Sequence, residues 1–266
     1  MQVKEISSTK NPMIKHVLML RDKSRERKKT SLFVIEGQRE LKLARKANYN
    51  IKTVLYCPDL ISINTLKEII PDHLECIQIS IDVFKKIAYR SSTEGIIAIA
   101  DIKQHHLKDL KFTNKNPVIL VAEAPEKPGN IGALLRTADA ANVDATIIAN
   151  PKGDIYNPNI IRSSVGCIFT NQIAIGDTDT IIAFLKDNNI AIYSAILQEA
   201  ENYHEQDFTS STAIVVGTEA DGLSKAWREA STKNIQIPMQ GEIDSMNVSV
   251  AAGILIFEVK RQRNFN

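Results

Sequence analysis

The sequence contains few cysteines and no long apolar run. Its 266 residues include three cysteines, and no CxxC pair is present. This count supports neither a zinc ribbon nor a disulfide framework, and a reducing cytoplasm is the simplest expectation. No stretch is long and apolar enough to span a bilayer, and the first ten residues lack the apolar core of a signal peptide. We therefore expect a cytoplasmic protein with no membrane partner.

Sequence motifs of several common enzyme classes are also absent. No G-x-G-x-x-G segment follows an expected strand, which argues against a Rossmann dinucleotide site. No G-x-S-x-G segment is present, so a hydrolase triad on a nucleophile elbow is not supported. The five histidines are scattered, and no cluster of His and Cys has the spacing of metal ligands. We expect no bound metal.

The charges that are present are unevenly distributed. The chain as a whole has a formal net charge of +2, but residues 1–50 carry 13 Lys or Arg against 5 Asp or Glu. Such asymmetry indicates a polyanionic partner for the front of the chain. The densest basic run spans residues 21–29, and a solvated loop is the alternative interpretation of it. Its candidate phosphate-binding residues are Arg21, Arg25, Arg27, Lys28 and Lys29.

The alternation of short apolar strands with helical stretches predicts an α/β chain of two domains. We expect a smaller front domain over residues 1–104, a polar linker over residues 105–116 and a second domain over residues 117–266. The second domain opens with a near-continuous apolar run, which is typical of a buried parallel strand. Its expected strands are residues 118–122, 145–149, 190–196, 213–216 and 234–237, and its expected helices include residues 131–141 and about 247–263.

Three polar clusters follow strands of the second domain, where parallel α/β sheets place their ligand sites. In the first, residues 126–138, Asn130 is a candidate helix N-cap and Arg136 lies about one and a half turns into the helix. A capped surface helix with an ordinary arginine is the alternative. In the third, residues 235–252, Ser245 or Asn247 starts the last helix. Its small residues also fit simple tight helix packing.

The second cluster, residues 215–224, resembles half of a phosphate-binding P-loop. Leu223 stands where that motif requires lysine, and Glu219 and Asp221 would repel phosphates. A nucleoside triphosphate site is therefore disfavoured, and the acidic glycine turn better suits a neutral or cationic ligand. The alternative is a strand-to-helix turn in which Gly217 and Gly222 only adopt special backbone angles.

Taken together and in this order, the three clusters resemble the three motifs of the SpoU-like branch of the SPOUT class of RNA methyltransferases. The resemblance covers about residues 117–266, and Met246 stands where leucine is commonest in the family. The front of the chain is more loosely similar to the ribosomal-protein-like substrate-binding domain of ribosomal RNA members, through residues 11–12, 33–37 and 92–98. The resemblance implies an α/β protein with a smaller N-terminal RNA-binding domain and a C-terminal trefoil-knotted methyltransferase domain.

The resemblance also implies the chemistry, which is methyl transfer from S-adenosylmethionine to a ribose 2′-hydroxyl of a structured RNA. It implies a homodimer with the active site at the subunit interface. Ribosomal RNA is the expected substrate; the same chemistry on transfer RNA, or a non-catalytic RNA-binding assembly factor, are the alternatives. The catalytic residues carried over are Asn130, Arg136, Glu219, Ser245 and Asn247. The residues that the resemblance assigns to cofactor binding are Gly217, Thr218, Ile237, Met239, Met246 and Val248. The cations of residues 21–29 then become RNA-binding candidates.

The family gives the central catalytic role to its motif 1 arginine, which is Arg136 here. Because an arginine is too basic to accept a proton, we hypothesise that Arg136 holds the target phosphate and polarises the hydroxyl, with a neighbouring phosphate as candidate proton acceptor. Asn130 is expected to order the motif 1 loop and the RNA backbone, and Glu219 to orient Arg136 or the substrate. Ser245 and Asn247 are expected to position the ribose or to fix the motif 3 loop.

Overall fold

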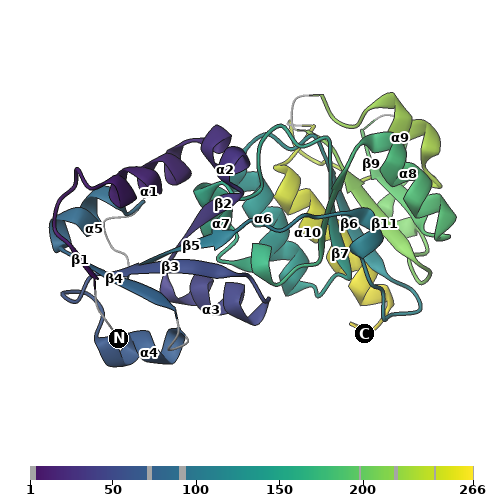
Figure 1. Cartoon of the computed structure of the whole chain (residues 1–266). Coiled ribbons are helices and arrows are strands. Elements are labelled where there is room, and N and C mark those ends of the chain that lie inside the picture. Colours follow the sequence, from purple (N-terminus) through teal and green to yellow (C-terminus); the bar gives the residue numbers. More distant parts are fainter. Residues whose placement is uncertain are drawn as a thin grey trace. The chain divides into compact units, whose positions relative to one another are not determined.

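The chain forms two compact units, which we describe separately (Figure 1). The computed structural model describes residues 4–70, 74–89, 94–197, 199–218, 221–242 and 244–265. Unit 1 consists of Met1–Gln104 and Gly153–Thr170, and unit 2 consists of His105–Lys152 and Asn171–Asn266. In the described part of the chain no helix is both long enough and apolar enough to cross a membrane.

Unit 1 is built on a five-stranded mixed sheet in the order β1-β4-β3-β5-β2. Strand β5 runs antiparallel to both of its neighbours, whereas β1, β4 and β3 are parallel. The strands are β1 (Lys4–Ile6), β2 (Leu32–Glu36), β3 (Ile51–Tyr56), β4 (Glu75–Ile79) and β5 (Ile96–Asp101). The helices from its first segment are α1 (Pro12–Asp22), α2 (Ser24–Thr30), α3 (Gln38–Lys46), α4 (Ile63–Ile69) and α5 (Ile81–Ile87). Apolar side chains of α1 and α5 share one core with the sheet.

Residues 153–170 belong to unit 1, although the sequence analysis assigns them to the second domain. They form α7 (Pro158–Ser163) and the short 3-10 helix η2 (Cys167–Phe169). Tyr156 packs on Phe33 with ring centroids 4.4 Å apart, and Phe169 meets Tyr49 edge-on at 5.1 Å. The Tyr49 and Tyr156 hydroxyls lie 3.0 Å apart, and burial raises the pKa of both phenols. This aromatic contact, distant in sequence, explains why the segment packs with unit 1.

Unit 2 is a seven-stranded parallel sheet in the order β10-β12-β9-β11-β6-β7-β8. The predicted strands of the second domain are all present. The strands are β6 (Val118–Glu123), β7 (Ala145–Ala149), β8 (Ile173–Gly176), β9 (Ala191–Ala195), β10 (Glu201–Asn202), β11 (Thr212–Val216) and β12 (Lys233–Gln236). The helices are α6 (Pro128–Ala140), α8 (Thr178–Asp187), α9 (Lys225–Ala230) and α10 (Val248–Gln262). The unit also contains two 3-10 turns, η1 (Leu107–Asp109) before β6 and η3 (Tyr203–Glu205) between β10 and β11.

Both faces of the unit 2 sheet are covered, as its continuous apolar strands predict. Alternate residues of β6 point into two different cores. One core contains side chains of α6 and α10, and the other contains side chains of α8 and α9. Because helices cover both faces of the sheet, the polar loops lie at the ends of the strands.

Helix α6 starts earlier than the sequence analysis predicts. Its N-cap is Lys127, Pro128 occupies the first helical position, and Asn130 lies inside the first turn. The prediction that Asn130 caps this helix is therefore wrong. The reason is that proline has no N–H to lose and a fixed φ, which suits the first helical position. Asn247, in contrast, caps α10 as predicted, since its Oδ1 accepts the Ser249 N–H at 3.0 Å.

Candidate active site

A cavity of about 720 Å³ opens in unit 2 beyond the carboxyl ends of β9, β11 and β12. Its size falls within the range of small-molecule and cofactor sites, and its place at the strand ends is where such sites form in parallel sheets. All six residues predicted to hold the cofactor line it: Gly217, Thr218, Ile237, Met239, Met246 and Val248. Ser245 and Asn247 line it as well. The structure thus brings motifs 2 and 3 together around one cavity.

The motif 2 loop contains two glycines that the structure requires for different reasons. A Cβ added to Gly217 would lie 2.6 Å from the Leu223 nitrogen and closer still to the Gly222 carbonyl. Gly222 has a φ of +67° with open space around it, so there the backbone angle is the constraint. Thr218 and Gly222 exchange two backbone hydrogen bonds of 3.1 Å each, which close the loop. Glu219, the predicted catalytic glutamate, lies outside the described residues.

The far end of the same loop is fixed by Glu123, a residue that the sequence analysis does not identify. Glu123 ends strand β6 and is buried. One carboxylate oxygen accepts the Ser224 N–H at 2.7 Å, and the other accepts the hydroxyls of Ser224 at 2.7 Å and Thr178 at 3.0 Å. These hydrogen bonds are charge-assisted and satisfy the buried carboxylate. An acidic residue ending an otherwise apolar strand is the only sequence signal that points to it.

Motifs 1 and 3 meet through two asparagine side chains. The Asn247 amide donates to Asn130 Oδ1 at 3.2 Å, while its own oxygen caps α10. Further along, a Cβ on Gly253 would lie 3.7 Å from the Thr137 methyl group, so α10 and α6 approach closely. The small residues of the third cluster therefore do serve helix packing. The Asn247–Asn130 hydrogen bond places Asn130 next to a residue that lines the cavity.

Arg136 is not among the residues that line the cavity. It is exposed on α6, and no hydrogen bond or ion pair holds its side chain within the described part of the chain. Thr137, the next residue, faces α10, and successive residues of a helix differ in direction by about 100°. Four of the predicted catalytic residues are described, and the structure gathers Asn130, Ser245 and Asn247 but leaves Arg136 apart.

The electrostatic character of the cavity fits a cationic ligand. Asp221 and Asp244 line it, together with one arginine, Arg228. A carboxylate near a sulfonium centre is favourable, whereas a phosphate would be repelled. The described residues contain no group of three or more His, Cys, Asp or Glu that could hold a metal ion. The cavity size, the bare Gly217 backbone and the acidic lining together fit S-adenosylmethionine.

The basic run of unit 1 divides into exposed and structural residues. Arg25, Lys28 and Lys29 are exposed on α2. Arg27 is 2% exposed and pairs with Asp154 at 2.7 Å while donating to the carbonyls of residues 20 and 21. It cannot contact phosphates, so its predicted RNA-binding role is wrong. The cause is a carboxylate 127 residues away in the sequence, which the local charge pattern cannot reveal.

Arg21 is also engaged in the fold. Its guanidinium donates to the backbone carbonyls of Lys86, Ile87 and Ala88 at 3.2–3.3 Å and pairs with Asp22 at 2.7 Å. An arginine in this position satisfies carbonyl groups at the end of α5 and complements the helix dipole. Three of the five predicted RNA-binding cations thus present exposed side chains on the short helix α2.

Comparison with known proteins decides the family. Residues 117–257 match the SpoU rRNA Methylase family. The chain belongs to the SpoU rRNA methylase family. Residues 11–98 of this SpoU member match the MRM3-like substrate binding domain, in agreement with the looser resemblance of the front of the chain. It is an RNA 2′-O-ribose methyltransferase that uses S-adenosylmethionine.

Several known proteins are similar to this chain along almost its whole length. It is 29% identical to the 23S rRNA (guanosine(2553)-2′-O)-methyltransferase RlmP of Bacillus subtilis over 97% of this chain and 100% of that protein. A crystal structure of an RNA 2′-O ribose methyltransferase is 34% identical with a TM-score of 0.84, covering 98% of this chain and 99% of that one. The AdoMet-bound rRNA methyltransferase of Sinorhizobium meliloti is 25% identical with a TM-score of 0.89, covering 98% of both chains. SPOUT neighbours carry the trefoil knot, so the predicted fold class is confirmed.

Proposed function

We propose that this chain methylates a ribose 2′-hydroxyl of 23S ribosomal RNA and that it does so as a homodimer. The observation that carries the proposal is the cavity at which motifs 2 and 3 converge and whose edge the motif 1 residue Asn130 reaches. When bound, S-adenosylmethionine supplies an electrophilic methyl group on a sulfonium centre. The chain's own residues have to hold the cofactor and align the hydroxyl with the carbon–sulfur bond.

The bare backbone of the motif 2 loop supports a cofactor held through main-chain groups. Gly217 leaves no room for a side chain, and Glu123 fixes the loop from beneath through Ser224. Ile237, Met239 and Val248 provide apolar lining for an adenosine ring. We assign Ser245 and Asn247 to positioning the ribose and the motif 3 loop, because both line the cavity. Glu219 retains its expected role as a residue that orients Arg136 or the substrate.

The proposal of a homodimer rests on α10 and on the place of Arg136. Val250 and Phe257 are 53% and 42% exposed, and they lie seven residues apart, about two helical turns. They form an apolar stripe on the side of α10 opposite its buried residues Leu255 and Val259. A second copy covering this stripe would let Arg136 of one subunit reach the cavity of the other, where it would hold the target phosphate and polarise the hydroxyl.

Ribosomal RNA is favoured over transfer RNA by the extent of the similarity. The relative from Bacillus subtilis, which is named for 23S rRNA, is matched over both units and not over the methylase domain alone. The exposed cations of α2 (Arg25, Lys28 and Lys29) offer phosphate contacts for such an RNA. A non-catalytic assembly factor would not need the asparagine contact between motifs 1 and 3 or the glycine-lined cavity.

Ribose methylation mapped across total RNA tests the proposal. We compare cells that contain the wild-type chain, no chain, and the Arg136→Ala variant. We expect one 23S position to be methylated only with the wild-type chain. If the methylation that depends on the chain lies in transfer RNA, the substrate is transfer RNA and not 23S rRNA. If no RNA carries a methylation that depends on the chain, the proposed activity is refuted.

Calorimetry with S-adenosylmethionine separates catalysis from cofactor binding. Because Arg136 does not line the cavity, Arg136→Ala should bind the cofactor with the wild-type dissociation constant and show no turnover. A variant that methylates at the wild-type rate would contradict the assignment of Arg136. Wild-type protein that fails to bind the cofactor would contradict the assignment of the cavity.

A further inference from the structure

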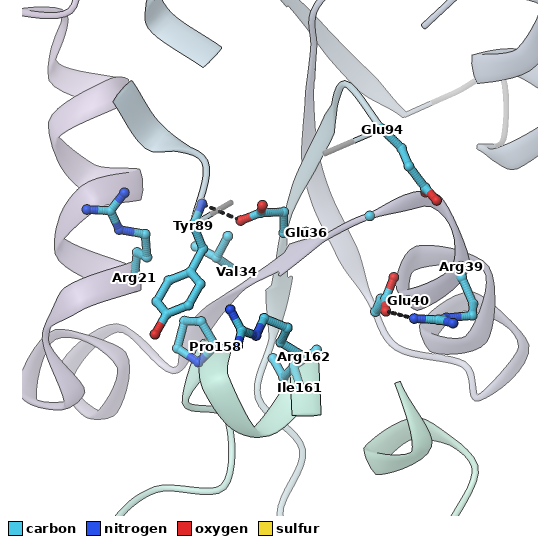
Figure 2. A pocket seen from close by; sticks show the side chains of 11 residues that line it. Arg21, Val34, Glu36, Arg39, Glu40, Tyr89, Glu94, Pro158, Ile161 and Arg162 are labelled. Carbon is cyan, nitrogen blue, oxygen red and sulfur yellow. Dashed lines mark hydrogen bonds and ion pairs between the residues drawn. The ribbon is translucent and has the colours of Figure 1, made fainter. Parts of the chain in front are cut away.

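A second cavity of about 110 Å³ lies within unit 1, and the proposed methylation does not use it. Helices α1, α3 and α7, strand β2 and the residues after α5 line it (Figure 2). At about 30 Å³ per water molecule it holds about four waters. It is therefore too small for a helix or a strand, but it can take one flat ring inserted from its edge. We call it the Tyr89 notch.

Tyr89 is an exposed aromatic residue whose backbone is held by hydrogen bonds. It is 46% exposed, yet Glu36 accepts its backbone N–H at 2.7 Å. Arg21 holds the three carbonyls that precede it, those of residues 86–88. The Arg162 guanidinium lies over the Tyr89 ring, 5.4 Å from its centroid, and Figure 2 shows the two side chains beside each other. A preorganised and accessible stacking surface is the kind that binds a planar ligand at little entropic cost.

The charges of the notch point to a neutral ligand. Three arginines and three glutamates line it, so their formal charges cancel: Arg21, Arg39, Arg162, Glu36, Glu40 and Glu94. A site for phosphate alone would carry a surplus of cations. Arg21 and the Arg39–Glu40 pair are engaged within the fold. The Arg162 guanidinium offers donors and the Glu36 and Glu94 carboxylates offer acceptors beside this space, which matches the edge of a nucleobase, since that edge presents both donors and acceptors.

We propose that the Tyr89 notch receives one unpaired nucleobase of the RNA substrate, stacked on Tyr89 and Arg162. The proposal rests on the proposed RNA substrate, but it concerns a different cavity from the cofactor site. The phosphates of the same strand have a ready contact in α2, which packs against α1 and carries Arg25, Lys28 and Lys29. Aromatic rings and arginine planes are the surfaces on which proteins stack splayed-out RNA bases.

Fluorescence anisotropy with two labelled RNAs tests the notch on the full chain. One probe is a fully paired 12-base-pair RNA duplex, and the other is the same duplex with a single bulged adenosine. We expect the wild-type chain to bind the bulged probe more tightly. Tyr89→Leu should weaken binding of the bulged probe by about five- to 150-fold, the range for losing one stacked base. It should leave binding of the duplex unchanged.

Three further variants identify the cause of any loss. Tyr89→Phe keeps the ring and should bind like wild type, and Met19→Ala removes a 43% exposed apolar side chain of α1 as a matched control. Arg162→Gln should weaken binding of the bulged probe without changing the salt dependence of that binding. A slope that falls by about 0.7–0.9 would instead show that Arg162 contacts a phosphate and would overturn its stacking role.

The outcomes distinguish this proposal from the proposed function. A wild-type chain that does not discriminate between the two probes, or a Tyr89→Leu variant that still does, overturns the notch. Neither result bears on methylation of 23S rRNA or on cofactor binding by the wild-type chain. The methylation mapping and the calorimetry described above test those two claims separately. Loss of discrimination in Tyr89→Leu, with cofactor affinity unchanged, supports a base-binding notch.

Discussion

Substitution of Gly217 by alanine should weaken cofactor binding without unfolding the chain. The added Cβ would lie 2.6 Å from the Leu223 nitrogen, whereas ordinary contacts begin at 3.4 Å. The loop would therefore have to open by about 0.8 Å or more. The three atoms nearest the added Cβ all belong to the backbone of Gly222 and Leu223 and cannot rotate away. The paired Thr218–Gly222 hydrogen bonds, now 3.1 Å, would then stretch beyond the usual range.

The magnitude follows from this forced opening. Inserting one methyl group into a packed site costs about 1–3 kcal/mol, and a loop that opens to accept it loses the geometry that lines the cavity. We expect the dissociation constant for S-adenosylmethionine, measured by calorimetry, to rise by about five- to 150-fold. Trp227, the only tryptophan of the chain, is fully buried next to α8, so its fluorescence can verify that the variant remains folded.

Two other glycines provide controls for the Gly217→Ala variant. Gly222 has open space but a φ of +67°, so Gly222→Ala bears only the left-handed backbone cost of roughly 1–2 kcal/mol. Gly153 in unit 1 has neither constraint, and Gly153→Ala should bind the cofactor normally. Wild-type affinity in Gly217→Ala would refute the view that this close approach shapes the cofactor loop.

Three further predictions concern unit 1, RNA binding and assembly. Arg27→Ala should lower the free energy of unfolding by about 3–5 kcal/mol because it leaves Asp154 without its partner; denaturant titration measures this, and a loss below about 1 kcal/mol would contradict a structural ion pair. Neutralising the three exposed cations of α2 together should weaken RNA binding and reduce the slope of log affinity against log salt by about 2–3, whereas an unchanged slope would exclude phosphate contacts there. Phe257→Glu should give a monomer in light scattering, and a persistent dimer would place the interface elsewhere.

The strands and the motif loops could be predicted from the sequence, because both depend on local patterns. Continuous apolar runs predicted five of the seven parallel strands of unit 2 but missed β8 and β10, and residues 217–218 and 245–248 do line one cavity. The order of the strands in the sheet could not be predicted, since it depends on crossovers and not on periodicity. The trefoil knot was available only from the family resemblance.

The wrong role of Arg27 and the omission of Glu123 share one physical cause, which is contact between residues far apart in the chain. Arg25 and Arg27 look alike in the sequence, yet only Arg27 meets Asp154 and becomes buried. Glu123 gains its role from Ser224, 101 residues later. The start of α6 is an exception, because there a local preference of Pro128 outweighed the capping preference of Asn130.

The assignment of residues 153–170 to unit 1 limits how far this protein can be divided into modules. The segment connects β7 to β8 of unit 2, yet its aromatic side chains complete the core around Phe33 and Tyr49. A front domain expressed as residues 1–104 would expose that core to water, and exchanging front domains between relatives would require transplanting this loop as well. Proteolytic cleavage within residues 105–116 should accordingly yield two fragments that purify together, because one of them retains part of the other's core.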